Sequence, residues 1–140
     1  MADKSREDEI ALAVQALNQS PFYRFIKMQV VKIGEGVSEV HLQLQPEYKN
    51  IWGLIHGGVA ATLLDTSCGT SLYSLLEQNE GAWTIDLHTS FLGQIREGLM
   101  IGRGKAVYRT RNLAWSQAEA FDQEGNLVAR GNAIHRVIKR

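Results

Sequence analysis

The sequence predicts an α+β domain in which an antiparallel sheet wraps around one central helix. The chain has 140 residues, of which 44% are hydrophobic and 21% are charged, so it is long and apolar enough to bury a core. Its hydrophobic period changes along the chain in the order helix, two strands, long apolar helix, four strands. Neither an internal repeat nor a low-complexity tract divides it.

The first predicted element is an amphipathic helix. Between Asp8 and Asn18 apolar side chains recur at helical spacing, and Ser20 and Pro21 interrupt the pattern. We therefore assign residues 1–21 to an N-terminal amphipathic helix and residues 22–140 to a single domain. The spaced apolar positions are Ile10, Ala13, Val14 and Leu17.

Strands are predicted on both sides of the apolar helix. From Met28 to Gln45 apolar and polar residues come to alternate, and the segment 34–36 supplies a glycine turn, which indicates a β-hairpin with one solvent-facing side. Pro46 cannot donate to a sheet ladder, so residues 46–53 should form a loop. After a turn near Gly81, we expect four further strands over residues 82–92, 98–109, 112–122 and 127–137.

The central helix should be buried on most sides. Between Lys49 and Glu77 the only charged residue is Asp65, and from Gly57 to Leu76 the residues are small or apolar on every helical face. One sheet can cover only part of such a helix. The uncovered part therefore predicts a homodimer, because a bare apolar face would otherwise aggregate.

The composition excludes several classes of protein. With 15 basic and 15 acidic residues the net charge is zero, which disfavours nucleic-acid binding. A single cysteine, Cys68, cannot form an internal disulfide and suits a reducing compartment. The N-terminus mixes charges where a signal peptide would not, and no apolar run could span a membrane, so we expect a cytoplasmic protein. His41 and His88 lack metal-ligand spacing, so no metal site is expected.

The chemistry-bearing segment is the start of the apolar helix. Gly57 and Gly58 leave the first, unpaired N–H groups of the helix open to a ligand, which suits an anion or a developing oxyanion. Asp65 lies on the same side of the helix, about 12 Å further along. A lone carboxylate there costs several kcal/mol unless it is paired or functional, so we predict a catalytic role. Taken alone, His56 and the glycine pair are more often structural.

Two copies would bring these groups together. In a two-fold dimer with antiparallel helices, Asp65 of one subunit can lie opposite Gly57 of the other, which makes two equivalent composite sites. One chain alone keeps the amide donors and the carboxylate apart.

The motif as a whole resembles one family. Asn50, the run His56-Gly57-Gly58, the pair Asp65-Thr66 and the closing segment 127–131 are similar to the hotdog-fold acyl-CoA thioesterases of the PaaI-like and acyl-CoA thioesterase 13-like group. The similarity covers about residues 22–137. It implies a sheet curled around one long helix, a dimer usually paired into a homotetramer, and hydrolysis of coenzyme A thioesters without a metal or cofactor.

The resemblance also implies roles for single residues. The amide of Gly57, helped by His56 and Asn50, would polarise the thioester carbonyl. Asp65 would activate a water as general base or attack the carbonyl itself, and of these we favour the activated water. Thr84 would orient that water, although a threonine also simply suits a strand.

Coenzyme A carries phosphates, so its binding needs local cations. The resemblance places the contacts in two groups, although Gly93 and Gln94 depart from common versions and any single surface arginine is more often only solvated. Arg136, near the C-terminus, is a further cation. The two groups are Phe91 with Arg96, and Arg109 with Arg111 and Asn112.

The sequence leaves three questions open. The acyl group is aromatic or a medium or long chain, and the sequence does not distinguish them. The alternative functions are a hotdog hydratase or dehydratase acting on acyl-CoA, and an acyl-CoA binding module without catalysis. Trp52, Trp83 and Trp115 could line an acyl tunnel, but we expect them to be core residues.

Overall fold

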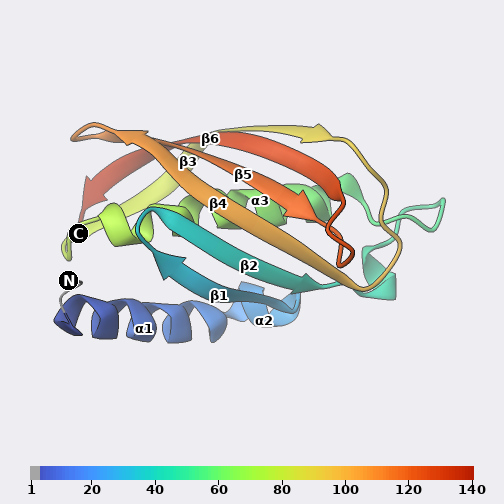
Figure 1. Cartoon of the computed structure of the whole chain (residues 1–140), viewed down its shortest axis with the longest axis horizontal. Helices are drawn as coiled ribbons and strands as arrows, with labels where there is room; N and C mark the ends of the chain where they lie inside the picture. Colours follow the sequence, from blue (N-terminus) through green and yellow to red (C-terminus); the bar gives the residue numbers. More distant parts are fainter. Residues whose placement is uncertain (1–3) are drawn as a thin grey trace.

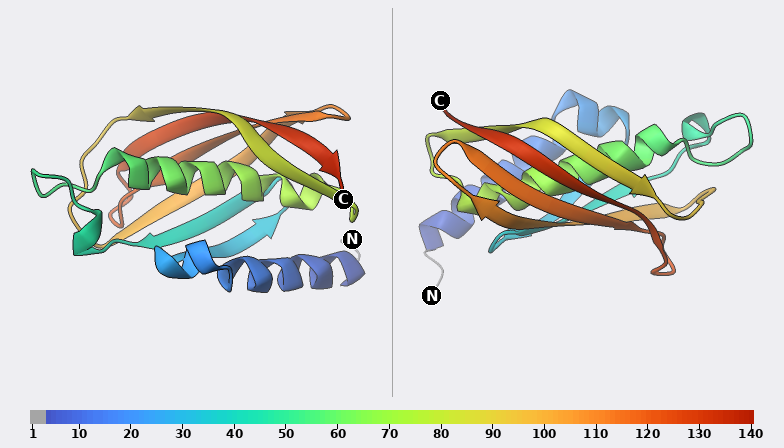
Figure 2. Two further views of the ribbon diagram at one scale, coloured as in Figure 1. Left: turned by 180° about the vertical axis from the view of Figure 1, so that it is seen from behind. Right: turned by 90° about the horizontal axis from the view of Figure 1, so that it is seen from above.

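One antiparallel sheet curls around one helix, as Figures 1 and 2 show. This computed structural model describes residues 4–140, so residues 1–3 of the predicted N-terminal helix lie outside the described part. The six strands follow the order β1-β2-β4-β5-β6-β3. The elements are α1 (Lys4–Asn18), α2 (Pro21–Phe25), β1 (Met28–Gly34), β2 (Val37–Gln43), η1 (Pro46–Tyr48), α3 (Gly57–Ser71), η2 (Tyr73–Leu75), β3 (Glu80–Phe91), β4 (Leu99–Arg109), β5 (Leu113–Phe121) and β6 (Leu127–Lys139).

The predicted fold is therefore confirmed. Two glycines of β4, which have no side chain, allow the sheet to lie close against the helix. A Cβ atom on Gly104 of β4 would collide with the carbonyl oxygen of Ser67 in α3. A Cβ atom on Gly102 would collide with the Ser67 hydroxyl. Glycine at these two positions lets the backbone of β4 lie directly against α3. The hydroxyl of Ser38 on β2 then donates a 2.8 Å hydrogen bond to the Ser67 carbonyl.

Only one side of α3 is buried in the single chain. Leu63, Leu64 and Cys68 are fully covered and pack against apolar residues of the sheet. The opposite side is only partly covered. This uncovered face comprises Gly58, Thr62, Asp65, Thr66 and Gly69. The expectation that one sheet covers only part of the helix is thus confirmed.

The N-terminal helices close one edge of the sheet. The side chain of Asn18, at the end of α1, accepts a 2.8 Å hydrogen bond from the Val30 N–H and donates a 2.9 Å bond to the Val30 carbonyl. It therefore occupies the β1 edge as a neighbouring strand would. Pro21 ends the α1 pattern as predicted but also begins α2, because the first position of a helix needs no N–H.

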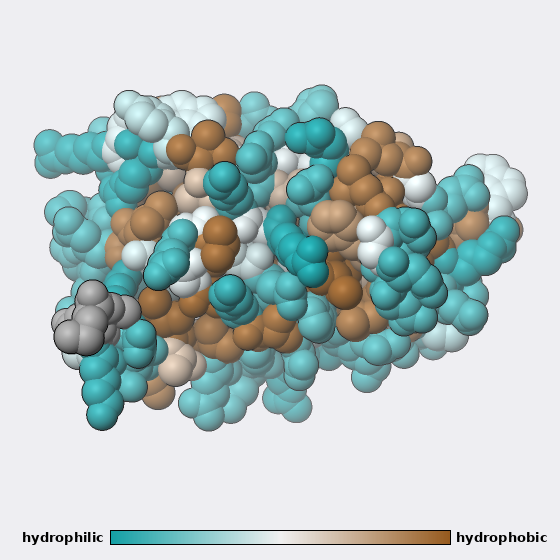
Figure 3. All heavy atoms as spheres, in the orientation of Figure 1, coloured by the Kyte–Doolittle hydropathy of each residue, from teal (hydrophilic) through white to brown (hydrophobic). Residues whose placement is uncertain are grey.

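The edge at β3 is open, and apolar side chains stand beside it. Trp83 and Ile85 of β3 are 54% and 55% exposed, and Trp52 is 72% exposed. Trp115 lies on the outer face of the sheet, where its ring contacts that of Tyr108 at 5.7 Å between centroids. The prediction of three core tryptophans was wrong, because strand alternation turns Trp83 and Trp115 away from α3. Figure 3 shows several hydrophobic areas between hydrophilic ones on the face seen in Figure 1.

Candidate active site

The first turn of α3 presents one free backbone donor. His56 caps the helix: its Nδ1 atom accepts a 2.8 Å hydrogen bond from the Gly58 N–H, and its carbonyl accepts a 2.9 Å bond from the Val59 N–H. The Gly57 N–H finds no acceptor within residues 4–140. A free N–H at the positive end of a helix is suited to hold a carbonyl oxygen that gains negative charge.

Asn50 supplies a second donor beside it. Its Oδ1 atom accepts hydrogen bonds from the N–H groups of Trp52 (2.9 Å) and Leu54 (3.2 Å) and so shapes the loop before α3. The Nδ2 group makes no hydrogen bond to any described residue. Asn50, Gly57 and the Phe91 ring line one cavity of about 280 Å³. The structure thus brings together two free donors and an aromatic wall.

His56 belongs to a different cavity. It lines a space of about 350 Å³ with Tyr48, Gly58 and Thr62, on the other side of the helix start from Asn50. Because its Nδ1 atom is used by the helix cap, only its Nε2 edge is available to a ligand. The structure therefore separates His56 from the Asn50 and Gly57 pair with which the resemblance grouped it.

Asp65 is held by Thr84. The Thr84 hydroxyl on β3 donates a 2.6 Å hydrogen bond to the Asp65 Oδ1 atom, and so links α3 to the open edge strand. The resemblance implied that the Thr84 hydroxyl orients the attacking water; in the single chain this hydroxyl donates its proton to the Asp65 carboxylate instead. The second oxygen of Asp65 is left for another partner.

A buried histidine extends this contact into the core. His135 on β6 is 1% exposed, its Nδ1 atom lies 3.4 Å from the Thr84 hydroxyl, and its Nε2 atom lies 2.8 Å from the Ser116 hydroxyl. Burial lowers the pKa of His135. Because Thr84 gives its own proton to Asp65, the imidazole donates from Nδ1 and accepts at Nε2 from Ser116, which fits the neutral ring.

Sequence reasoning missed His135 and Ser116. The signal was present: on β6 the inward positions 131, 133, 135 and 137 alternate with outward ones, and His135 is the only polar side chain on that buried side. A lone imidazole among Gly131, Ala133 and Val137 should have been assigned a partner, because buried polar groups are rarely left unpaired.

The predicted coenzyme A contacts lie beyond opposite ends of α3. Arg96 lies near the start of α3, where its Nη1 atom would be 3.9 Å from a Cβ on Gly53. Arg109 lies beyond the other end of α3 and donates 3.0 Å hydrogen bonds to both carboxylate oxygens of Glu80 and to the Leu75 carbonyl.

The bonds from Arg109 hold the pKa of Glu80 at about 2. Arg109 therefore supports the structure beyond the C-terminal end of α3. Arg111 and Asn112, in the turn that follows β4, are exposed, as is Arg136 on the outer face of the sheet. No described helix is long and apolar enough to cross a membrane, and residues 4–140 hold no cluster of three or more His, Cys, Asp or Glu suited to a metal ion.

The two halves of the site are separated within one chain. Gly57 begins α3 and Asp65 follows eight residues later, which corresponds to about 12 Å along the helix axis. Asp65 lies on the uncovered face of α3 and Thr84 on the open edge strand, so both are at the surface that a second copy could reach.

Comparisons with known proteins identify the family. The family model of the thioesterase superfamily matches residues 53–129, more than half of the chain. A curated protein of Sulfurisphaera tokodaii is 26% identical over 133 residues, 95% of this chain and 97% of its own length. The 1,4-dihydroxy-2-naphthoyl-CoA hydrolase of Escherichia coli is 24% identical over 116 residues, covering 82% of this chain and 85% of that enzyme.

A solved structure supports the fold. The thioesterase family protein of Silicibacter pomeroyi superposes with a TM-score of 0.85 at 21% identity, covering 94% of this chain and 99% of that one. The hotdog arrangement predicted from the sequence is thus confirmed.

Proposed function

The chain belongs to the thioesterase superfamily, and we propose that it hydrolyses acyl-CoA thioesters to a free acid and CoA in sites shared between two copies. The observation that carries the proposal is the pair of half-sites on one chain. One half offers the free donors of Gly57 and Asn50, and the other offers the carboxylate of Asp65 held by Thr84.

The donors act on the thioester carbonyl. As a nucleophile adds, the carbonyl oxygen becomes an oxyanion, and fixed N–H donors stabilise that charge more than they stabilise the starting thioester. The Gly57 N–H is fixed by the helix, and the Asn50 amide is fixed by its own Oδ1 bonds to Trp52 and Leu54. Neither donor must reorganise when the charge develops.

Asp65 supplies the base. With Oδ1 bound to the Thr84 hydroxyl, Oδ2 accepts a proton from a water that attacks the carbonyl carbon, and the tetrahedral intermediate then expels the CoA thiolate. Single turnover in oxygen-18 water distinguishes this from direct attack by Asp65. The activated water labels the acid product in the first turnover, whereas direct attack followed by water attack on the Asp65 carbonyl of the mixed anhydride puts the label on Asp65 and releases a first product with the unlabelled carboxylate oxygen.

The shared site requires an antiparallel pair of α3 helices. The uncovered face of α3 and the open edge of β3 lie side by side, since Thr84 bonds Asp65, and together they offer a surface for a second copy. A two-fold axis there places the partner's Asp65 opposite Gly57. It also brings Arg111 and Asn112 of one copy toward Arg96 of the other, which would reunite the two groups of predicted coenzyme A contacts. Pairing of such dimers into a tetramer is part of the same proposal.

The substrate class follows from the cavities and from one relative. Cavities of about 280 and 350 Å³ flank the start of α3, and ligand pockets of small molecules begin at about 300 Å³. The curated Escherichia coli relative acts on an aromatic acyl-CoA. We therefore propose an aromatic or medium- to long-chain acyl group.

A panel of acyl-CoAs assayed with a free-thiol reagent tests the function. A hydrolase releases CoA, and kcat/KM across the panel identifies its acyl group. A hydratase or dehydratase would change the acyl chain without releasing a thiol, and a binding module would do neither. Absence of thiol release with every member of the panel, including acyl carrier protein thioesters, would refute hydrolysis.

A further inference from the structure

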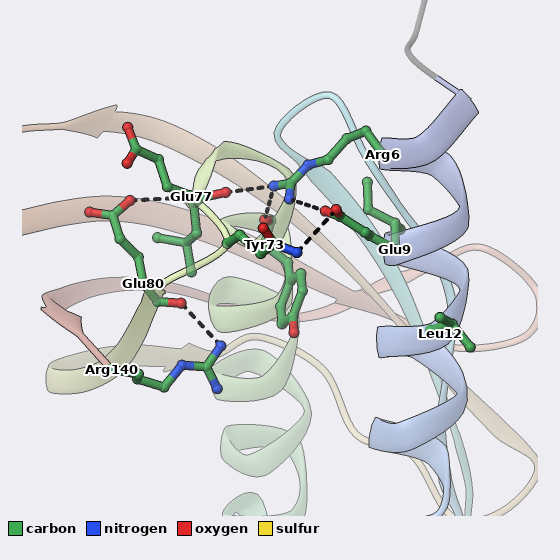
Figure 4. A pocket seen from close by; sticks show the side chains of 10 residues that line it. Arg6, Glu9, Leu12, Tyr73, Glu77, Glu80 and Arg140 are labelled. Atoms are coloured by element: carbon green, nitrogen blue, oxygen red, sulfur yellow. Dashed lines mark hydrogen bonds and ion pairs between the residues drawn. The ribbon is translucent and has the colours of Figure 1, made fainter.

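We propose that the tip of the loop before α3, formed by Ile51 and Trp52, docks into the cavity between α1, η2 and β3 of a second copy of this chain (Figure 4). This inference rests on the shared site proposed above. It assigns a partner to the loop and gives the N-terminal helix, which the family resemblance does not cover, a place in the dimer.

The loop tip presents two large apolar side chains to solvent. Ile51 is 88% exposed, the highest value among the large apolar residues in the described part of the chain, and Trp52 is 72% exposed. The loop is tightly held: the Asn50 N–H donates a 2.7 Å hydrogen bond to the Leu54 carbonyl, and Gly53 adopts a φ of +74° that favours glycine. A rigid tip loses little entropy on docking.

The receiving cavity lies beyond the other end of α3. It has a volume of about 180 Å³, below that of small-molecule sites and suited to a protein side chain. Figure 4 shows Arg6 of α1 reaching across to η2, where it donates hydrogen bonds to the carbonyls of Tyr73 (3.2 Å) and Leu76 (2.5 Å). Arg6 thus fixes α1 as one wall. The apolar lining comprises Ile10, Leu12, Tyr73 and Leu76.

The register of the shared site brings these two features together. If Gly57 faces the partner's Asp65, the two-fold axis passes beside Ala61, midway between the two positions. Residues of α3 before Ala61 then face residues of the partner's α3 equally far after it. The loop tip lies beyond the N-terminal end of α3, so it comes toward the C-terminal end of the partner's α3, which leads into Tyr73 in the cavity wall.

Charge complementarity supports the same pairing. Lys49 precedes the tip and Glu77 stands at the cavity rim; both are exposed, and neither makes an ion pair within residues 4–140. Docking would bring opposite charges together while the two apolar side chains leave water. Asn50 is at the base of this loop, so the partner would also steady a carbonyl donor of the active site.

Cross-linking tests the contact directly. In a Trp52→Cys, Gln78→Cys chain, a short bis-maleimide should give a band of twice the chain weight, because Gln78 lines the cavity. Both positions in one chain lie beyond opposite ends of the 15-residue α3, about 22 Å long, so the short reagent cannot join them within it. The native Cys68 is buried, and burial raises its pKa to about 11, so it should not react.

The matched control is a Trp52→Cys, Gln117→Cys chain. Gln117 is exposed on the outer face of the sheet, so this chain should give no cross-linked dimer band. A protein that sediments as a dimer but never cross-links through Trp52→Cys and Gln78→Cys would overturn the docking while leaving the shared site intact. A protein that stays monomeric would overturn both proposals.

Fluorescence supplies a second, cysteine-free measurement. In a Trp83→Phe, Trp115→Phe chain, Trp52 is the only tryptophan, and its emission should shift to the blue as concentration drives dimerisation. An emission shift that appears with anionic lipid vesicles and not with dimerisation would overturn the proposal in favour of a membrane contact.

A charge on the cavity rim should weaken the dimer. Leu12 is 66% exposed in the single chain, so Leu12→Glu should fold normally but place a charge against the incoming tip. We expect dimer affinity to fall by about tenfold or more, and Ala11→Glu, which carries the same charge on an exposed neighbour outside the cavity, to leave it unchanged. Equal effects of the two variants would contradict the docking.

Discussion

The hydroxyl of Thr84 donates a 2.6 Å hydrogen bond to the carboxylate of Asp65, across 19 residues of sequence. This contact fixes the one carboxylate of an otherwise uncharged helix against β3, the edge strand on the opposite side of the sheet from β1 and the N-terminal helices. Within residues 4–140 the other carboxylate oxygen has no hydrogen-bond partner, and Asp65 lies on the face of α3 that a second copy could reach.

Replacing Asp65→Asn should abolish turnover and keep the fold. The amide oxygen can still accept the Thr84 hydrogen bond, but the side chain can no longer take a proton from water. Loss of a positioned general base costs about 10²- to 10⁴-fold in kcat. Steady-state kinetics measures the loss, and thermal unfolding checks the fold. If more than about a tenth of the wild-type kcat survived, Asp65 would be a structural residue.

Two inactive variants should restore each other when mixed. Asn50→Asp keeps the oxygen that shapes the loop but replaces the Nδ2 donor with a second acceptor. In a heterodimer with an Asp65→Asn chain, one of the two composite sites has both intact halves, so an equal mixture should regain about a quarter of wild-type activity. Subunit exchange is verified with a tagged chain. Failure to recover after that exchange would place the site within one chain.

Arg111 should contribute to binding the coenzyme A nucleotide. Arg111→Glu is expected to raise KM for acyl-CoA with a smaller effect on kcat, because the phosphates are remote from the carbonyl. Wild-type KM should also rise with salt, as the Debye length falls from about 10 Å at 0.1 M to about 3 Å at 1 M. An acyl-pantetheine, which lacks the nucleotide, should respond to neither change. Equal impairment of both substrates would rule out this contact.

The pair of Glu80 and Arg109 should stabilise the fold at neutral pH. Pairing lowers the pKa of Glu80 from 4.5 to about 2, so its stabilisation is complete above pH 4.5 and is lost as the pH falls toward 2. Glu80→Gln should lower the free energy of unfolding by about 1.5–3 kcal/mol at pH 7. Denaturant titrations from pH 7 to pH 3 should show this difference narrowing. A difference independent of pH would mean that packing, and not the charge, is responsible.

His135 should make stability fall in mild acid. Burial lowers its pKa below 6.5, so between its lowered pKa and 6.5 the unfolded chain binds more protons than the folded one. Stability should therefore decrease as the pH drops below about 6.5, and His135→Gln should remove this component. The glutamine can still bond both hydroxyls, so a reduced kcat at unchanged KM would show that the ring also positions Thr84. The measurements are unfolding curves at several pH values and the pH profile of kcat.

Much of the fold could be predicted from the sequence because its signals are local. Alternation of apolar residues located all six strands, and the long uncharged segment with one aspartate located α3. The order of these elements left few ways to bury the helix, so the hotdog arrangement was predictable. The run from His56 to Asp65 indicated the half-sites for the same reason, because a helix start and a lone carboxylate in an uncharged segment are recognisable without knowing what surrounds them.

The tertiary structure decided which side chains are actually available. It committed Arg109 to Glu80 and the Nδ1 atom of His56 to the helix cap, although the sequence left both free to bind substrate. It joined His135 and Ser116, 19 residues apart on neighbouring strands, and turned tryptophans predicted for the core toward solvent.

These outcomes depend on strand register and on contacts between distant segments. One chain's periodicity does not specify such contacts, because a shift of a single residue in register would turn each side chain to the other face of the sheet. The sequence by itself therefore determined the elements and the kinds of chemical group, and the packing of strands against α3 determined which of those groups meet.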